Sequence, residues 1–142
     1  MIRTEHYYTD EIEVSVESKD WVEAKVLEFE KDPFQYNIIR MKVLADLIVT
    51  VEETKGFLGV FIDDEPNPRA VIESDLTFPH IFKVEFDTIN VPYGRHTLKI
   101  KMKSEQGYRV TNSFLEVHIT RWFNIYEMIG QIIPLAITGA ID

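Results

Sequence analysis

The chain has 142 residues, of which 45% are hydrophobic and 12% aromatic, a formal net charge of -9 and no cysteine. This length and composition indicate one globular domain with a single core, and they exclude a disordered or fibrous chain. The negative charge opposes binding to nucleic acid and to anionic membranes, and the lack of cysteine excludes disulfides, thiolate metal sites and cysteine nucleophiles.

The first two predicted strands lie near the start of the chain. Glu11 to Glu17 alternates acidic and apolar residues, which predicts a half-buried strand with Ile12, Val14 and Val16 on its inner side. Trp21 to Glu30 predicts a second strand, and its apolar phase changes near Val26. A β-bulge at that position explains the change of phase.

A long apolar run from Tyr36 to Glu52 follows. It exceeds the length of a typical strand, so we expect it to bend or to contain two consecutive strands. Ile38, Leu44 and Ile48 point to the face opposite the main apolar phase. Another part of the protein is therefore expected to cover that second face.

Short strands fill the rest of residues 1–120. They are predicted over Phe57 to Ile62, Ala70 to Glu73, His80 to Asp87, Arg95 to Lys103 and Val110 to Thr120. Turn-rich segments separate them at Asp63 to Pro68, Val91 to Gly94 and Ser104 to Gly107. This regular spacing without intervening helices predicts an all-β antiparallel β-sandwich over residues 1–120.

Residues 121–142 form a second, helical segment in this prediction. Helical spacing puts the apolar residues Trp122, Ile125, Tyr126, Ile129, Ile132 and Ile133 on one face of an amphipathic helix. Pro134 is expected to kink or end this helix. The segment carries Asn124, Glu127 and Gln131, polar residues that disfavour a membrane span, and its polar face lacks the basic residues of an interfacial membrane helix.

The stretch from Leu58 to Ile119 carries a pattern of motifs in a fixed order. They are Gly59-Val60-Phe61-Ile62-Asp63-Asp64, Phe86-Asp87-Thr88 and Val91-Pro92-Tyr93-Gly94-Arg95-His96-Thr97-Leu98, followed by a hairpin with Gly107 near its tip. The stretch resembles the second half of bacterial and phage immunoglobulin-like domains. The resemblance implies an immunoglobulin-like sandwich with a role in adhesion, spacing or decoration.

Candidate chemistry is sparse. Asp63, Asp64 and Glu65 suit either a weak calcium site or, as we favour, a solvated turn. The four histidines lack zinc-ligand spacing, and His96 is expected to donate a ring N–H to a backbone carbonyl at a corner. No nucleophile motif or opposed carboxylate pair is recognisable, so we expect a protein that is not an enzyme and that holds no metal or cofactor.

Two charged rows lie on predicted strands. Glu11, Glu13 and Glu17 form an acidic row, and Arg95, Lys99, Lys101 and Lys103 form a basic one. Cross-strand pairing within the sheets is favoured over contacts between neighbouring subunits, because rows of opposite charge are common in antiparallel sheets.

The apolar C-terminal segment is the strongest functional signal. Exposed, it would form a larger patch than soluble monomers leave bare, so either the chain itself or a neighbouring subunit must cover it. We therefore expect a structural or decorating subunit of a multi-subunit assembly, such as a virion or phage tail. Its partners would be copies of itself or other subunits. The residues expected to make the contact are Trp122, Phe123, Ile125, Tyr126, Ile129, Ile132 and Ile133.

An adhesin-like module is the alternative. It would bind a glycan or a protein through the loops Asp63 to Pro68 and Ser104 to Gly107. Residues 1–10 show no secretory signal pattern, and the compartment stays open. A virion or an extracellular surface is favoured over the cytoplasm.

Overall fold

The computed structural model describes residues 3–34 and 37–130, which form an all-β protein with a short helical segment at residues 125–130. In these residues no helix is long and apolar enough to cross a membrane. The strands, in chain order, are β1 (Arg3–Asp10), β2 (Val14–Val16), β3 (Val22–Lys31), β4 (Ile38–Ala45), β5 (Ile48–Val49), β6 (Gly56–Ile62), β7 (Ala70–Ser74), β8 (Phe82–Asp87), β9 (Gly94–Ser104), β10 (Val110–Asn112) and β11 (Leu115–Trp122).

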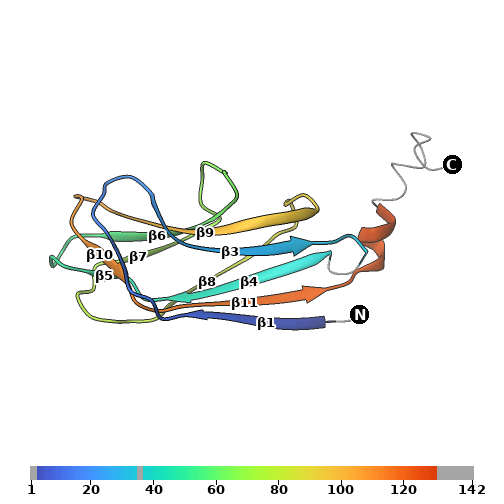
Figure 1. Cartoon of the computed structure of the whole chain (residues 1–142), viewed down its shortest axis with the longest axis horizontal. Coiled ribbons are helices and arrows are strands. Elements are labelled where there is room, and N and C mark those ends of the chain that lie inside the picture. The colour runs from blue at the N-terminus through green and yellow to red at the C-terminus, as the bar shows by residue number, and fades with distance from the viewer. Residues whose placement is uncertain (1–2, 35–36, 131–142) are drawn as a thin grey trace.

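Antiparallel pairing arranges these strands in two four-stranded sheets and a small third one. The first sheet has the order β1-β11-β4-β8 and the second has the order β3-β9-β6-β7. The three-stranded sheet β2-β10-β5 continues the first sheet past a kink, because β1 leads into β2, β4 into β5, and β10 into β11. The strands run along the long axis of the molecule (Figure 1). The predicted antiparallel β-sandwich is confirmed.

The strand pairs follow a simple rule. Strands of the first half pair with strands of the second half in reverse order: β1 with β11, β3 with β9, β4 with β8, and β6 with β7. The chain is thus one long hairpin, rolled so that successive pairs fall alternately on the two sheets. This is a jelly-roll arrangement.

The immunoglobulin-like part of the expectation is not confirmed. Immunoglobulin sheets have the orders A-B-E-D and C-F-G, in which the first two strands of the chain are neighbours in one sheet. Here β2 only continues β1 past the kink, and the next strand, β3, lies in the opposite sheet. Alternation of apolar residues shows which side of a strand is buried, but it does not show which strand lies beside it.

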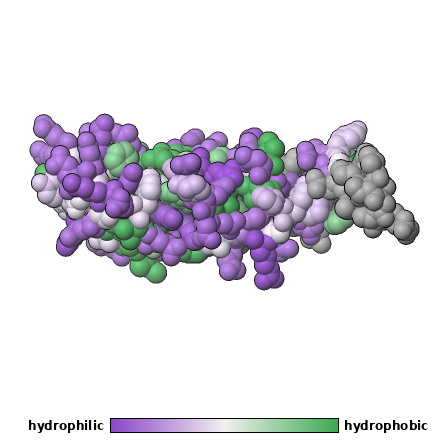
Figure 2. Space-filling model, turned by 90° about the horizontal axis from the view of Figure 1, so that it is seen from above, coloured by the Kyte–Doolittle hydropathy of each residue, from purple (hydrophilic) through white to green (hydrophobic). Residues whose placement is uncertain are grey.

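Alternating apolar residues of both sheets fill one core. Its fully buried members include Ile39, Met41, Leu58, Leu98, Met102 and Leu115. The surface visible in Figure 2 is largely hydrophilic, with separate hydrophobic patches. Strand β6 is buried on both faces, because the Trp21 side chain covers its outer face beside Gly59 and Phe61. A Cβ on Gly59 would lie 2.9 Å from the Trp21 ring, so this close contact requires glycine.

The start of the chain differs from the prediction. Residues 3–10, for which no strand was predicted, form β1 and pair along their whole length with β11. The predicted strand over Glu11 to Glu17 is reduced to β2, and Ile12 is 69% exposed instead of buried. The physical reason is a turn, because the Asp10 carboxylate accepts the N–H of Ile12 at 2.7 Å and draws the chain out of the sheet.

Two irregularities were partly predicted. The bulge in β3 occurs between Glu23 and Lys25, just before the expected position, and it turns Lys25 toward the interior. The long run beginning before Ile38 does bend, with the break at Asp46. The buried Asp46 carboxylate accepts the backbone N–H groups of Ser113 at 2.7 Å and Phe114 at 3.1 Å. It thereby holds the kinks of two neighbouring strands together.

Candidate functional site

The predicted contact segment begins at the end of β11. Trp122 is the last residue of that strand and is not helical. Helical residues 125–130 follow, and the Asn124 side chain accepts the N–H of Tyr126 at 2.9 Å and that of Glu127 at 3.4 Å. Asn124 therefore caps the helical turn.

A buried asparagine holds this cap in place. The side-chain amide of Asn37 donates to the Asn124 carbonyl oxygen at 2.6 Å, and its oxygen accepts the Asn124 N–H at 2.8 Å. The same amide group lies 3.2 Å from the carbonyl oxygen of Pro33. Asn37 is only 2% exposed, so these hydrogen bonds form away from water. The exit of the chain from the sandwich is thus held at a defined point.

The helical turn lies beyond the end of the sheets (Figure 1). Its apolar side chains are largely open to solvent: Ile125 is 51% exposed, Tyr126 81% and Ile129 40%. Phe123 and Met128 are half-buried, as is Trp122. Ile132 and Ile133, the remaining predicted contact residues, lie outside the described residues, as does most of the predicted amphipathic helix.

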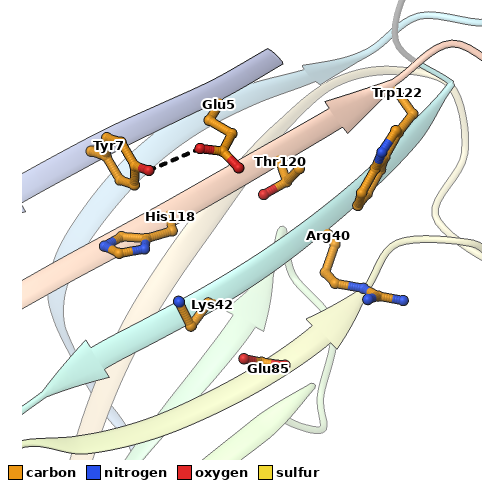
Figure 3. A pocket seen from close by; sticks show the side chains of 8 residues that line it. All are labelled: Glu5, Tyr7, Arg40, Lys42, Glu85, His118, Thr120 and Trp122. Carbon is orange, nitrogen blue, oxygen red and sulfur yellow. Dashed lines mark hydrogen bonds between the residues drawn. The ribbon is translucent and has the colours of Figure 1, made fainter. Parts of the chain in front are cut away.

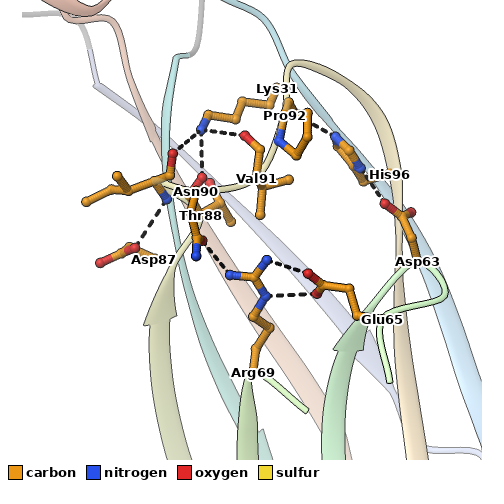
Figure 4. Close-up of polar contacts among 11 residues, drawn as sticks. Lys31, Asp63, Glu65, Arg69, Asp87, Thr88, Asn90, Val91, Pro92 and His96 are labelled. Atoms are coloured by element: carbon orange, nitrogen blue, oxygen red, sulfur yellow. Dashed lines mark hydrogen bonds and ion pairs between the residues drawn. The ribbon is translucent and has the colours of Figure 1, made fainter. Parts of the chain in front are cut away.

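A network of polar contacts stabilises the loops at the same end (Figure 4). The Lys31 ammonium is buried and donates to the carbonyl oxygens of Thr88 at 2.6 Å, Val91 at 2.9 Å and Ile89 at 3.2 Å. Burial lowers the pKa of Lys31 below its usual range. The Lys31 ammonium therefore holds three backbone carbonyl groups of the loop between β8 and β9 in place.

The acidic loop after β6 is also internally paired. Glu65 forms a two-pronged ion pair with Arg69 at 2.9 and 2.6 Å, and Asp64 contacts Lys99 at 3.1 Å. Among the described residues, no group of three or more histidines and carboxylates is arranged to hold a metal ion. The carboxylates of Asp64 and Glu65 thus contact basic side chains of the same chain.

His96 and Asp63 form the corner that the sequence partly predicted. His96 donates Nε2–H to the Pro92 carbonyl oxygen at 2.6 Å, which confirms the expected contact with a backbone carbonyl. Its Nδ1 lies 2.6 Å from the Asp63 carboxylate, which also accepts the Thr97 N–H at 2.8 Å. Burial alone would raise the pKa of Asp63, but these two hydrogen bonds and the charges of His96 and Lys99 together outweigh burial and hold that pKa below its usual value.

The two loops of the adhesin alternative lie apart. Ile62, which precedes the loop Asp63 to Pro68, is at one end of β6, and Gly56, which pairs with Ser104, is at the other. At about 3.3 Å per residue, this separates the two loops by roughly 20 Å. They cannot form one compact binding site for a small ligand.

The basic row on β9 contacts its own protein. Lys101 lies 4.6 Å from the centre of the Phe61 ring, and Lys103 lies 4.6 Å from that of Trp21. Lys99 contacts Glu23 at 3.9 Å as well as Asp64. Cation–π contacts and cross-strand pairs within the chain therefore engage these lysines.

A surface hollow of about 310 Å³ lies on the outer face of the first sheet. The register places Thr120 of β11 between Glu5 of β1 and Arg40 of β4. Figure 3 shows the short Thr120 side chain amid longer ones, with Tyr7 toward one side and Trp122 toward the other. The hollow could not be predicted from the sequence, because its lining residues come from β1, β4, β8 and β11 and no local pattern shows that these strands pair.

No protein family model matches the chain, and no curated protein matches it. Among solved structures, the infectious bursal disease virus VP2 subviral particle aligns over 86% of this chain and 37% of the viral chain, with 7% identity and a TM-score of 0.47. The structure of the infectious bursal disease virus Gx strain aligns over 82% of this chain and 32% of the viral chain, with 10% identity and a TM-score of 0.46. A family two carbohydrate esterase from Cellvibrio japonicus aligns over 85% of this chain and 35% of the esterase chain, with 14% identity and a TM-score of 0.33. The chain thus spans roughly a third of each of these chains. Such values assign neither a family nor a function.

Proposed function

We propose that this chain is a non-enzymatic structural or decorating subunit of a multi-subunit assembly, such as a virion or a phage tail, and that its apolar C-terminal segment is the contact element. The observation that carries the proposal is the exposure of Ile125, Tyr126 and Ile129 on one short helical turn beyond the end of the sandwich. Large apolar side chains grouped in this way are typical of surfaces that bind another protein.

The hydrogen bonds that attach the start of this segment to the sandwich support this role. Asn37 holds Asn124 by two hydrogen bonds, and Asn124 in turn caps the helical turn. A helical turn that is held in place in this way, at residues 125–130, loses less conformational entropy when it binds. The sandwich then serves as a spacer that presents this element. Jelly-roll sandwiches also occur in viral capsid domains, which is an analogy of fold alone.

Truncation tests the proposal. A chain ending after Asn124 keeps all of β11 and the hydrogen bonds to Asn37, so its sandwich should unfold at nearly the same temperature as that of the full chain. Light scattering should give an oligomer for the full chain and a monomer for the truncated one. The same number of subunits for the two chains in solution would contradict the proposed contact element.

A further inference from the structure

We propose that the hollow around Thr120, on the outer face of the sheet β1-β11-β4-β8, is a binding site for a neutral saccharide. The site is formed by sheet residues and is independent of the assembly role proposed above. Its volume of about 310 Å³ is at the lower end of the range for small-molecule sites, which is about 300 to 1,000 Å³. That size suits a single sugar residue, such as the end of a glycan chain.

Thr120 forms the floor of the site. On β11 its same-face neighbours are His118 and Trp122, and across the sheet it lies between Glu5 and Arg40. All four neighbours are much longer than threonine, so the surface dips at this residue. The Thr120 hydroxyl can both donate and accept a hydrogen bond at the bottom of the hollow.

Two aromatic side chains stand on opposite sides of the floor (Figure 3). The Tyr7 ring packs edge-on against the His118 ring, with 4.4 Å between their centres, and its hydroxyl donates to Glu5 at 3.0 Å. The Arg40 guanidinium lies 5.8 Å from the centre of the Trp122 ring. Rings held in this way lose little freedom on binding, and their apolar faces can pack against the C–H face of a sugar.

The charged groups around the hollow balance one another. Arg40 and Lys42 supply two cations, and Glu5 and Glu85 supply two carboxylates. An anionic ligand would meet the two carboxylates, and a cationic ligand would meet Arg40 and Lys42. A sugar hydroxyl donates one hydrogen bond and accepts others, so a neutral polyhydroxyl ligand can use both kinds of group at once.

The test compares two threonine-to-phenylalanine substitutions on the same sheet face. Thr120→Phe fills the floor of the hollow, whereas Thr9→Phe places an equal side chain on β1 outside the lining residues. Both positions lie on strands, where an aromatic residue is well tolerated. The probes are the methyl glycosides of glucose, galactose, mannose and N-acetylglucosamine, with methyl glucuronide as the acidic comparison, and the readout is the amide NMR shifts of the full chain.

We expect at least one neutral glycoside to shift amides of β1, β4 and β11. Thr120→Phe should weaken that binding about tenfold or more, and Thr9→Phe should leave it within about twofold. Tyr7→Ala should also weaken binding, whereas Tyr7→Phe, which keeps the ring, should largely retain it. The proposal fails if no neutral glycoside shifts these amides, if Thr120→Phe binds as the unmodified chain does, or if the glucuronide binds more tightly.

Discussion

Asn37 and Asn124 lie far apart in the sequence, yet the side chain of the first pairs with the backbone of the second by two hydrogen bonds of 2.6 and 2.8 Å. This pair joins the residue that directly precedes β4 to the residue that caps the helical turn. It connects the sandwich directly with the proposed contact element.

Asn37→Ala should therefore affect both stability and assembly. Loss of the buried amide leaves the backbone groups of Asn124 without their partner, which should lower the free energy of unfolding by about 1 to 3 kcal/mol. The freed contact element should also bind more weakly. Urea denaturation and light scattering measure the two effects. Asn67→Ala, at an exposed loop position, is the control, and equal results for the two variants would refute the role of Asn37.

Asp46 should be essential to the kinks between the first sheet and its three-stranded continuation. Asp46→Ala leaves the N–H groups of Ser113 and Phe114 without a carboxylate acceptor. We expect the free energy of unfolding to fall by about 2 to 4 kcal/mol, because the site is buried. Asp46→Asn should recover part of this loss. A loss in urea denaturation below about 0.5 kcal/mol for Asp46→Ala would show that the kinks hold without it.

Lys25 of β3 and Asp10 of β1 form an ion pair between the edge strands of the two sheets. Their ion pair is 3.4 Å long and joins the two sheets, and the Lys25 side chain is 4% exposed. Lys25→Met should cost about 1 to 3 kcal/mol, because the Asp10 carboxylate loses its cationic partner. Combining it with Asp10→Asn should recover much of that cost. A double-mutant cycle that gives additive costs would exclude a coupling between the two residues.

The inward charge of Lys25 also protects an edge strand. Bulges and inward-pointing charges are two of the ways in which natural sheets avoid pairing edge to edge, and β3 has both. We expect the Lys25→Met variant to aggregate more readily than the unmodified chain on mild heating. Turbidity measures this, and unchanged aggregation would leave Lys25 with its ion pair alone.

Asp63 should make stability depend on pH in the acid range. Its pKa in the folded chain is held below the usual 3.8, so between these two values the unfolded chain binds more protons than the folded one. The stabilisation is complete above pH 3.8 and is lost as the pH falls through the folded pKa. Asp63→Asn should remove this part of the acid destabilisation in thermal melts, whereas Asn67→Ala should retain it. Identical pH profiles for Asp63→Asn and the unmodified chain would contradict the effect.

Alternation in the sequence was enough to predict most strands, because most strands have one buried face and one solvated face. The length of the run from Tyr36 to Glu52 predicted a bend or two strands without locating the break, which lies at Asp46, and the contact of His96 with a backbone carbonyl was also predicted. It did not predict β1, whose inner side carries polar or amphipathic residues such as His6 and Tyr8. The predicted inward position of Ile12 was wrong, because its backbone N–H donates to the Asp10 carboxylate and the chain leaves the sheet there.

The candidate sites depend on pairings that no local pattern contains. The hollow around Thr120 needs β1 beside β11 and β11 beside β4, and these strands come from opposite ends of the sequence. The exposure of Ile125 and Tyr126 follows from where β11 ends and from the Asn37 contact. Helical spacing alone does not show which side of a segment the protein's own core will cover.

The most direct measurement is the solution mass of the full-length chain with Ile125→Lys and Ile129→Lys combined, determined by light scattering. These two exposed positions are four residues apart on the helical turn, so the charges should disrupt a contact there without disturbing the sandwich. We expect the unmodified chain and the exposed control Glu127→Lys to be oligomeric and the double variant to be a monomer of unchanged melting temperature. A monomeric unmodified chain, or a double variant that keeps the oligomeric mass, would contradict assembly through this segment.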